Sequence, residues 1–255
     1  SSLVGSEMCL RERRMMSDFY MGIIKKRREG KTDGTGHDMI SALMEQSYKG
    51  GRDINDREIA HMMIALLMAG QHTSSATGSW AMLRLASRPE IIEELYEEQV
   101  RVYSDGAGGF APLDYDTQKS SVPVLDAVIR ETLRMHPPIH SLMRRVKSDM
   151  VVPPTLAAPK TGKGQSTDTY VIPKGLYLVA APGVSPMDPH VWCDADKFDP
   201  HRWLGDKTLI DQTDDAQEDF GWGLVSTGAN SAYLPFGAGR HRCIGEEIAD
   251  LRLGS

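Results

Sequence analysis

The sequence predicts a mainly α-helical protein with small β-sheets, and three features of its 255 residues support this. Apolar residues of the first half recur at three- and four-residue intervals, a spacing that places them on one face of a helix. After Pro138 the apolar residues gather instead in short β-prone runs, which proline and glycine separate. Hydrophobic residues make up 40% of the chain, enough to build a buried core.

Local signals bound five expected helices before Pro138. Asn55 and Glu58 have capping-box spacing ahead of the third and most regular helix. Pro89 starts the fourth helix, and the fifth cannot continue through His136-Pro137-Pro138 because proline removes an amide donor. The expected helices span about 11–29, 39–48, 56–87, 89 to the glycine-rich loop at 105–109, and 123–135.

A β-rich segment is expected over about 139–185. Its β-prone runs lie at 150–152, 170–172 and 176–180. Two polar stretches, 153–168 and 211–219, are expected to be loops without a functional role.

Charge and cysteine content exclude several classes of protein. With 29 Lys plus Arg against 35 Asp plus Glu, the net charge is -6, so a nucleic-acid binder is not expected. The three cysteines, Cys9, Cys193 and Cys243, form no C-x-x-C pair and indicate neither a disulfide framework nor a zinc site. The longest apolar run, 62–69, is shorter than the roughly 18 residues that span a bilayer. Since Ser1 opens the chain without a signal-peptide pattern, we expect an internal piece of a longer protein.

Cys243 is the first candidate for chemistry, in the run Phe236-Gly-Ala-Gly-Arg-His-Arg-Cys-Ile-Gly245. A free thiol has a pKa of roughly 8.5, so a thiolate ligand needs a metal, nearby cations or a helix N-terminus. Three basic residues precede the cysteine, and the residues from Gly245 onward are typical of a helix start. Glycines at 237, 239 and 245 allow a flat ligand to approach the backbone. The alternative is an inert buried cysteine beside a basic turn.

This run resembles the haem-binding signature of the cytochrome P450 family. The resemblance implies the C-terminal half of the cytochrome P450 fold, with residues 1–255 forming a partial domain and 234–245 its haem-cysteine loop. It implies that haem b is the cofactor and that Cys243 is the axial ligand of its iron. Phe236, Gly237, Gly239 and His241 would also contact the haem, and His241, where many members have arginine, would donate to a propionate.

Two further motifs of the family follow in the same order. Glu131 and Arg134 share one face of the helix expected over 123–135, because they are three residues apart. Arg202 lies downstream in Phe198-Asp-Pro-His-Arg-Trp203. The resemblance implies that Glu131, Arg134 and Arg202 form a buried, structural triad that supports the cysteine loop. The alternative is three unrelated surface charges.

The helix expected over 56–87 contains residues that are unfavourable in the middle of a helix. Gly70 and Thr73 both have unfavourable helix propensity, and such a conflict indicates a functional site. Gly70 would let a planar ligand approach and permit a widened helical turn. The alternative is a notch for helix packing, with His72 as an ordinary core histidine. The segment resembles the oxygen-binding part of the family, and its His72-Thr73 pair resembles the fungal sterol 14α-demethylase branch, which assigns both residues to catalysis.

The same branch implies a substrate pocket. Ser141, Leu142 and Met143 would line it, and Arg144 would contact a haem propionate; the alternative is an ordinary edge strand. The full set implied for the pocket is Met68, Ala69, His72, Ser141, Leu142 and Met143, with Gly70 placed among the residues that contact the haem.

The resemblance implies a haem-thiolate monooxygenase that removes the 14α-methyl group of lanosterol or eburicol in ergosterol biosynthesis. NADPH and O₂ would be co-substrates, with electrons delivered by NADPH-cytochrome P450 reductase. It also implies azole inhibitors as ligands and attachment to the endoplasmic reticulum membrane, facing the cytosol, through an N-terminal anchor absent from this sequence. Two alternatives stay open: a different cytochrome P450 hydroxylase, or a haem-less fragment without enzyme activity.

Overall fold

The structure is a computed structural model of the chain. It describes residues 2–31, 38–112, 114–152, 170–189, 191–204, 233–237 and 242–246. The chain divides into two compact units, Ser1–Ser75 and Ala76–Ser255, and each is considered by itself. The expected loops at 153–168 and 211–219 lie outside the described residues.

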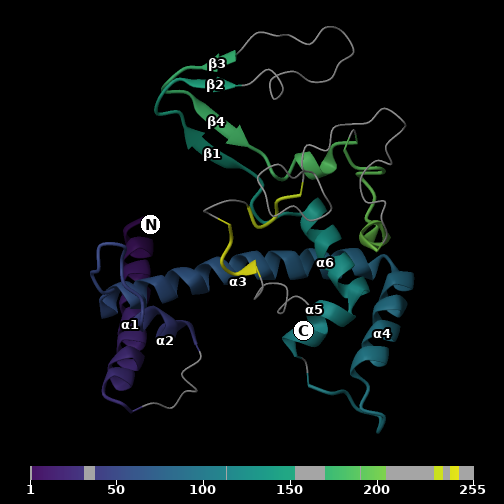
Figure 1. The fold of residues 1–255 in the computed structure, drawn as a ribbon, viewed down its shortest axis with the longest axis horizontal. Helices are drawn as coiled ribbons and strands as arrows, with labels where there is room; N and C mark the ends of the chain where they lie inside the picture. The colour runs from purple at the N-terminus through teal and green to yellow at the C-terminus, as the bar shows by residue number, and fades with distance from the viewer. Residues whose placement is uncertain are drawn as a thin grey trace. The chain divides into compact units, whose positions relative to one another are not determined.

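The structure confirms the mainly helical class with small β-sheets (Figure 1). The helices are α1 Ser2–Arg28, α2 Met39–Met44, α3 Asp56–Ala86, α4 Pro89–Tyr103, α5 Tyr115–Ser121 and α6 Pro123–Met135. Two short 3₁₀ helices follow, η1 Ser185–Met187 and η2 Pro200–Trp203. The strands are β1 Leu142–Arg145, β2 Met150–Val152, β3 Tyr170–Ile172 and β4 Tyr177–Ala180.

Two helix bounds and one additional helix differ from the sequence prediction. The helix expected to begin near residue 11 begins at Ser2, because no proline interrupts the residues before it. The helix expected over 39–48 ends at Met44, because the chain then turns back and the Tyr48 amide donates to the Arg52 carbonyl at 2.8 Å. Helix α5 was not predicted. The Asp114 carboxylate caps it by accepting from the amides of two residues in its first turn.

The first unit has a small apolar core where α1, α2 and α3 meet. Ile24, Ile40, Ile59 and Ala60 are buried there. The capping box expected at the start of α3 is confirmed: the Glu58 amide donates to Asn55 Oδ1 and the Asn55 amide to Glu58 Oε2, both at 3.0 Å. These bonds satisfy two amides that a helix start would otherwise leave unpaired.

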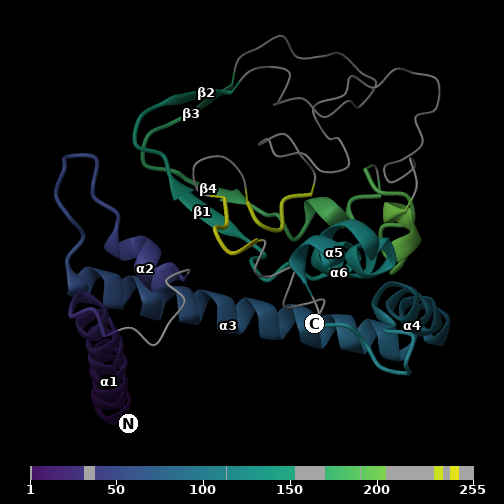
Figure 2. The same cartoon turned by 60° about the horizontal axis from the view of Figure 1, so that its bottom comes forward.

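The strands form one bent antiparallel ladder in two parts, β1 with β4 and β2 with β3 (Figure 2). Met143 pairs with Val179 in the first part and Val151 with Val171 in the second. Backbone bonds between Val146 and the turn at Gly175 and Leu176 join the two parts, each at 2.9 Å. Gly175 has φ +96°, in the left-handed region where a side chain would be strained.

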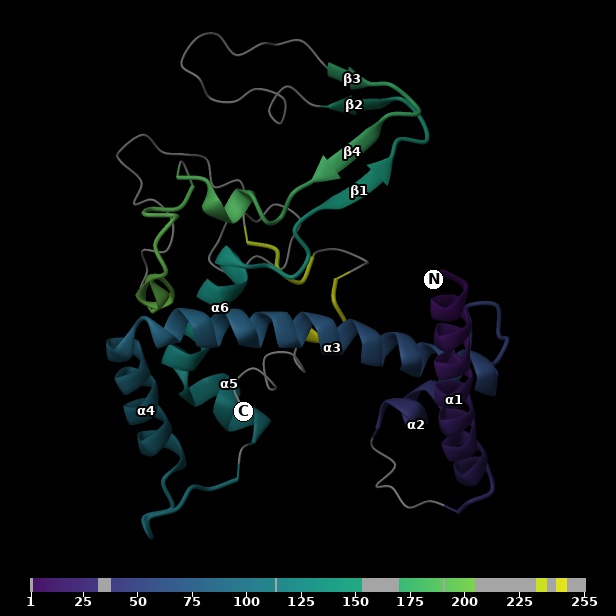
Figure 3. The ribbon, with the colours of Figure 1, turned by 180° about the vertical axis from the view of Figure 1, so that it is seen from behind.

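Helix α6 is the centre of the second unit. Eight of its residues are buried: Ala127, Val128, Ile129, Glu131, Thr132, Leu133, Arg134 and Met135. Its apolar face packs with Ile91 of α4 and with Phe198. Seen from behind, α4 leaves the end of α3 and runs away from it (Figure 3).

Glu98 of α4 fixes the start of α6. Its carboxylate is 1% exposed and accepts from the amides of Val124 and Leu125 at 2.8 and 3.0 Å. Proline occupies the first position of α6, and the preceding residue gives no side-chain cap. A glutamate that lies 26 residues earlier therefore caps this helix.

We expect Glu98→Ala to lower the free energy of unfolding by about 1–3 kcal/mol, because two partly buried amides lose their acceptor. Urea titration of the chain measures this. The control is Glu97→Ala, which removes the exposed neighbour on the same helix. Equal effects of the two substitutions would contradict the capping role.

Candidate functional site

A buried carboxylate organises the second unit. Glu131 is 0% exposed, and its two oxygens accept five hydrogen bonds. Arg134 donates two at 2.8 Å, Arg202 one at 3.0 Å and the Trp203 indole one at 2.9 Å. The fifth comes from the Asp199 amide at 3.0 Å. We call Glu131, Arg134, Arg202 and Trp203 the Glu131 network.

Two guanidinium groups face one carboxylate in this network, which leaves one positive charge in excess. Backbone carbonyls compensate for it. Arg134 Nη1 donates to the carbonyls of Pro186 and Ala195 at 2.6 and 2.8 Å, and Arg202 Nη1 donates to that of Cys193 at 2.9 Å. Because these carbonyls lie in the chain around η1 and η2, the network also fixes the course of those segments.

The three charges singled out in the sequence therefore lie together, and the sequence analysis missed their aromatic partners. Trp203 completes the hydrogen bonding of Glu131, and the Arg134 guanidinium lies 5.5 Å from the ring centroid of buried Trp192. The role of Trp203 could have been predicted from its position directly after Arg202. An indole N–H that is taken out of water needs a hydrogen-bond acceptor, and Glu131 was already expected beside Arg202.

The cysteine loop is attached to this network through Tyr233. The Tyr233 ring lies 4.8 Å from that of Trp203, and its hydroxyl donates to the Arg130 carbonyl at 3.4 Å. Further along the loop, the Cys243 amide donates to the Phe236 carbonyl at 2.8 Å. Gly237 has φ +72°, which this turn requires and which favours glycine.

The Cys243 thiol is free and exposed. A Cβ added at Gly245 would lie 3.9 Å from the sulfur, so the cysteine has little covering on that side. Gly239 and His241 lie outside the described residues. An accessible sulfur beside glycines, on a loop held by its backbone, fits the axial ligand that a haem iron would need.

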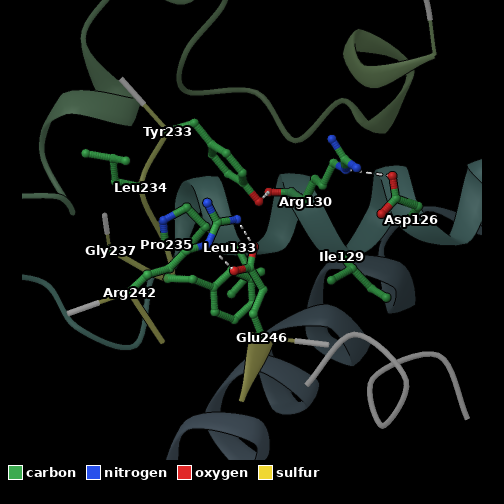
Figure 4. A pocket seen from close by; sticks show the side chains of 11 residues that line it. Asp126, Ile129, Arg130, Leu133, Tyr233, Leu234, Pro235, Gly237, Arg242 and Glu246 are labelled. Carbon is green, nitrogen blue, oxygen red and sulfur yellow. Dashed lines mark hydrogen bonds and ion pairs between the residues drawn. The ribbon is translucent and has the colours of Figure 1, made fainter. Parts of the chain in front are cut away.

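A pocket lies between α6 and the cysteine loop (Figure 4). Two ion pairs stand in its wall, Arg130 with Asp126 at 2.6 Å and Arg242 with Glu246 at 2.5 Å. The hydrogen bonds that Arg242 donates to Glu246 raise the pKa of Arg242 above its ordinary value. Of the three cations expected to favour a Cys243 thiolate, Arg242 thus already has a carboxylate partner, and the other two lie outside the described residues.

The predicted oxygen-site residues lie on α3, in the first unit. His72 is exposed and Thr73 half-buried, with the Thr73 hydroxyl donating to the Ala69 carbonyl at 2.7 Å. Met68 and His72 form one stripe, and Ala69 and Thr73 the next, because residues four apart share a helix face. The widened turn expected at Gly70 is not present: α3 is α-helical throughout, with open space around the Gly70 Cα.

The predicted pocket residues on β1 divide between the two faces of the ladder. Because successive side chains of a strand point to opposite faces, Leu142 and Arg144 share one face and Met143 lies on the other. Ser141 precedes the strand, and its hydroxyl is 2.8 Å from Nδ1 of His140. Only Leu142 and Arg144 can therefore face one ligand from the same side of the strand.

The part of the chain that the structure describes has neither a metal-binding cluster nor a membrane-spanning helix. No group of three metal-binding side chains occurs among the described residues. In the same part of the chain, no helix is long and apolar enough to cross a membrane.

A mainly helical fold in which a buried ion network lies beside a loop with an exposed cysteine agrees with the haem-thiolate family that the cysteine motif resembles. The family model described as Cytochrome P450 matches residues 6–254, and the chain belongs to this family. The heme domain of cytochrome P450DA is similar in structure, with a TM-score of 0.70 and 23% identity over 94% of this chain and 45% of its own. A second cytochrome P450, CYP102L1, has a TM-score of 0.71 and 20% identity, covering 98% of this chain and 49% of its own. These two likenesses show the fold.

Curated relatives are closer in sequence. "Lanosterol 14-alpha demethylase" of Mycosarcoma maydis is 62% identical over 252 residues, which cover 96% of this chain and 45% of the relative. "Eburicol 14-alpha-demethylase" of Uncinula necator is 50% identical over 243 residues, 94% of this chain and 44% of the relative. The chain thus spans less than half the length of these relatives.

Removing the charge of buried Glu131 should lower the stability of the fold far more than removing the charge of exposed Asp126. We expect Glu131→Gln to lower the free energy of unfolding by about 3–5 kcal/mol, because two buried guanidinium groups lose their carboxylate. Asp126→Asn, which breaks an exposed pair on the same helix, should cost at most about 0.5 kcal/mol. Urea titration compares the two variants, and similar losses would refute the central role of Glu131.

The ion pair of His201 with Glu94 at 2.8 Å, which links η2 to α4, should make stability depend on pH. The hydrogen bond that His201 Nε2 donates to the Glu94 carboxylate raises the pKa of His201 above its ordinary 6.5. The folded state therefore holds the proton more tightly, so this stabilisation is complete below pH 6.5 and disappears as pH rises through the folded-state pKa. Thermal unfolding from pH 5.5 to 8.5 should show this loss in the wild type and not in His201→Gln. An unchanged pH profile in the variant would contradict it.

Proposed function

We propose that this chain is the haem-binding and catalytic C-terminal part of a monooxygenase that removes the 14α-methyl group of lanosterol or eburicol. The observation that carries the haem assignment is the exposed Cys243 thiol on a loop that Tyr233 joins to the Glu131 network. The 62% identity to a lanosterol 14-alpha demethylase supports the sterol as substrate.

Haem b, when bound, would supply the oxidation of the substrate by O₂. Cys243 would bind the iron as thiolate, and Phe236, Gly237 and Gly239 would let the macrocycle lie close to the backbone. Arg144 and His241 would donate to the propionates. Of these, Arg144 shares its face of β1 with Leu142, so the same strand face would offer an anion contact and an apolar contact.

His72 and Thr73 would handle protons on the distal side. A neutral imidazole both accepts and donates protons near physiological pH, and the His72 side chain is exposed. The Thr73 hydroxyl donates its hydrogen to the Ala69 carbonyl of the helix backbone, so toward a ligand its oxygen would act as a hydrogen-bond acceptor. Met68, Ala69, Ser141 and Leu142 would contact the sterol, whereas Met143 lies on the opposite face of β1 from Leu142.

The partners follow from this assignment. Electrons would come from NADPH through NADPH-cytochrome P450 reductase. The complete protein would lie on the cytosolic face of the endoplasmic reticulum membrane, held by an N-terminal anchor. Azoles would bind as inhibitors, since their ring nitrogen is a ligand for haem iron.

The haem assignment is tested in a chimera, in which this chain replaces the matching 252 residues of the Mycosarcoma maydis relative. Reduced and exposed to carbon monoxide, the chimera should show the Soret band of a thiolate-bound haem. Cys243→Ser should abolish this band, and Cys193→Ser, which alters an exposed cysteine outside the loop, should leave it unchanged. A chimera without the thiolate band would refute the haem assignment.

The substrate is tested by titrating the same chimera with lanosterol and with eburicol. A sterol that displaces a water ligand from the iron shifts the Soret band, so we expect a saturable shift with both. A fatty acid of similar carbon number is the control. A shift with the fatty acid and none with either sterol would identify a different hydroxylase and refute the sterol assignment.

A further inference from the structure

Three side chains join α3 to the end of α6 in the second unit. The Trp80 ring of α3 stacks on the His136 imidazole, with centroids 3.9 Å apart and planes at 3°. Arg84, one turn further along α3, donates from Nε and Nη2 to Nε2 of His136 at 3.0 and 2.9 Å. Trp80 and Arg84 act together because residues four apart share a helix face.

This geometry requires one protonation state of His136. Both guanidinium donors point at Nε2, so this nitrogen must offer its lone pair and the ring proton must be on Nδ1. Arg84 of α3 and Arg134 of α6 are the charged groups that act on His136 among the described residues, and both are cations. Burial first, then these two cations, hold the pKa of His136 below its ordinary 6.5.

His136 is the residue that directly follows α6, at the start of the connection to β1. Its amide donates to the Thr132 carbonyl at 2.8 Å and ends α6, and the segment 137–141 then leads to the first strand. The next anchor of this segment is the His140 carbonyl, which accepts from the Gly183 amide at 3.1 Å. Fixing His136 therefore fixes the start of the segment that carries Ser141 and precedes Leu142 and Arg144.

We propose that Trp80, Arg84 and His136 form a positioning clamp that holds the segment 137–141 in place and opens when His136 takes up a proton. The positive charge of an imidazolium would stand 2.9 Å from a guanidinium, and its Nε2 would no longer accept. The clamp itself stands apart from the proposed function. Its consequence, a pH-dependent placement of the predicted pocket residues on β1, rests on that function.

The protonation state is tested by NMR on the ¹⁵N-histidine-labelled chain, with His136→Gln to assign the signals. We expect the Nδ1–H tautomer at pH 7.5 and a titration midpoint below 6.5. The Nε2–H tautomer, or a midpoint at or above 6.5, would overturn the proposal. This measurement needs neither haem nor sterol, so its failure is distinct from failure of the proposed function.

The positioning role is tested by hydrogen exchange of the amides in 139–145, after correction for the intrinsic effect of pH. In the wild type, exchange should rise about two- to tenfold between pH 7.5 and 5.0, the effect of one lost hydrogen bond. His136→Gln keeps an acceptor and does not titrate, so its exchange should be independent of pH. His136→Phe keeps the stack and loses the acceptor, so its exchange should be raised at both pH values.

The control is His201→Gln, which removes a titrating histidine outside the clamp and should leave the pH response of 139–145 intact. If His201→Gln abolishes that response, or if His136→Gln retains it in full, His136 is not the group that opens the clamp. If a His136 variant fails to fold, the tautomer and the titration midpoint of His136 in the wild type decide the question. The His136 signals are then identified by the ring-current shift that the stacked Trp80 ring causes.

Discussion

The Glu131 carboxylate is the constraint on which the second unit depends. Burying an anion costs free energy unless hydrogen-bond donors replace the water that it loses. Here five donors, from α6, η2 and the residue before η2, surround the carboxylate. The arginines in turn need the carbonyls around η1 and Cys193, so the chain between β4 and Trp203 follows the hydrogen-bonding needs of one ion network. Tyr233 connects the cysteine loop to this network, because its ring packs on Trp203.

A network of this kind works only if α6 is itself fixed, and its two ends are held by residues of other helices. Glu98 of α4 accepts from the first free amides of α6, and Arg84 of α3 donates to His136 at its other end. Glu98 pairs backbone amides that the helix start leaves free, whereas Arg84 binds a side chain, the His136 imidazole, at the other end. The two ends respond differently to acid, because only the His136 contact depends on an uncharged histidine.

Local patterns predicted what depends on neighbours in sequence, and missed what depends on contacts across the chain. The α3 cap was predictable because Asn55 and Glu58 are three residues apart, and the network charges because each lies in a compact motif. Glu98 looked like one more charge on a charged helix, and nothing near it in the sequence shows that α6 lacks a cap. The split of Leu142 and Met143 between strand faces needed the observed strand, since the motif alone places them side by side.

The electrostatics of Cys243 also differ from what its basic neighbourhood predicts. Counting Arg242 as a cation beside the thiol overstates the positive potential, because its charge is offset by Glu246 in an ion pair at 2.5 Å. The Cys243 amide donates to the Phe236 carbonyl and so serves to close the turn. The Cys243 sulfur is exposed, and its loop is held by backbone and aromatic contacts. A metal ion coordinated by this sulfur would bring a large positive charge next to it. The loop therefore supplies the position of the sulfur, and a bound iron would add this positive charge.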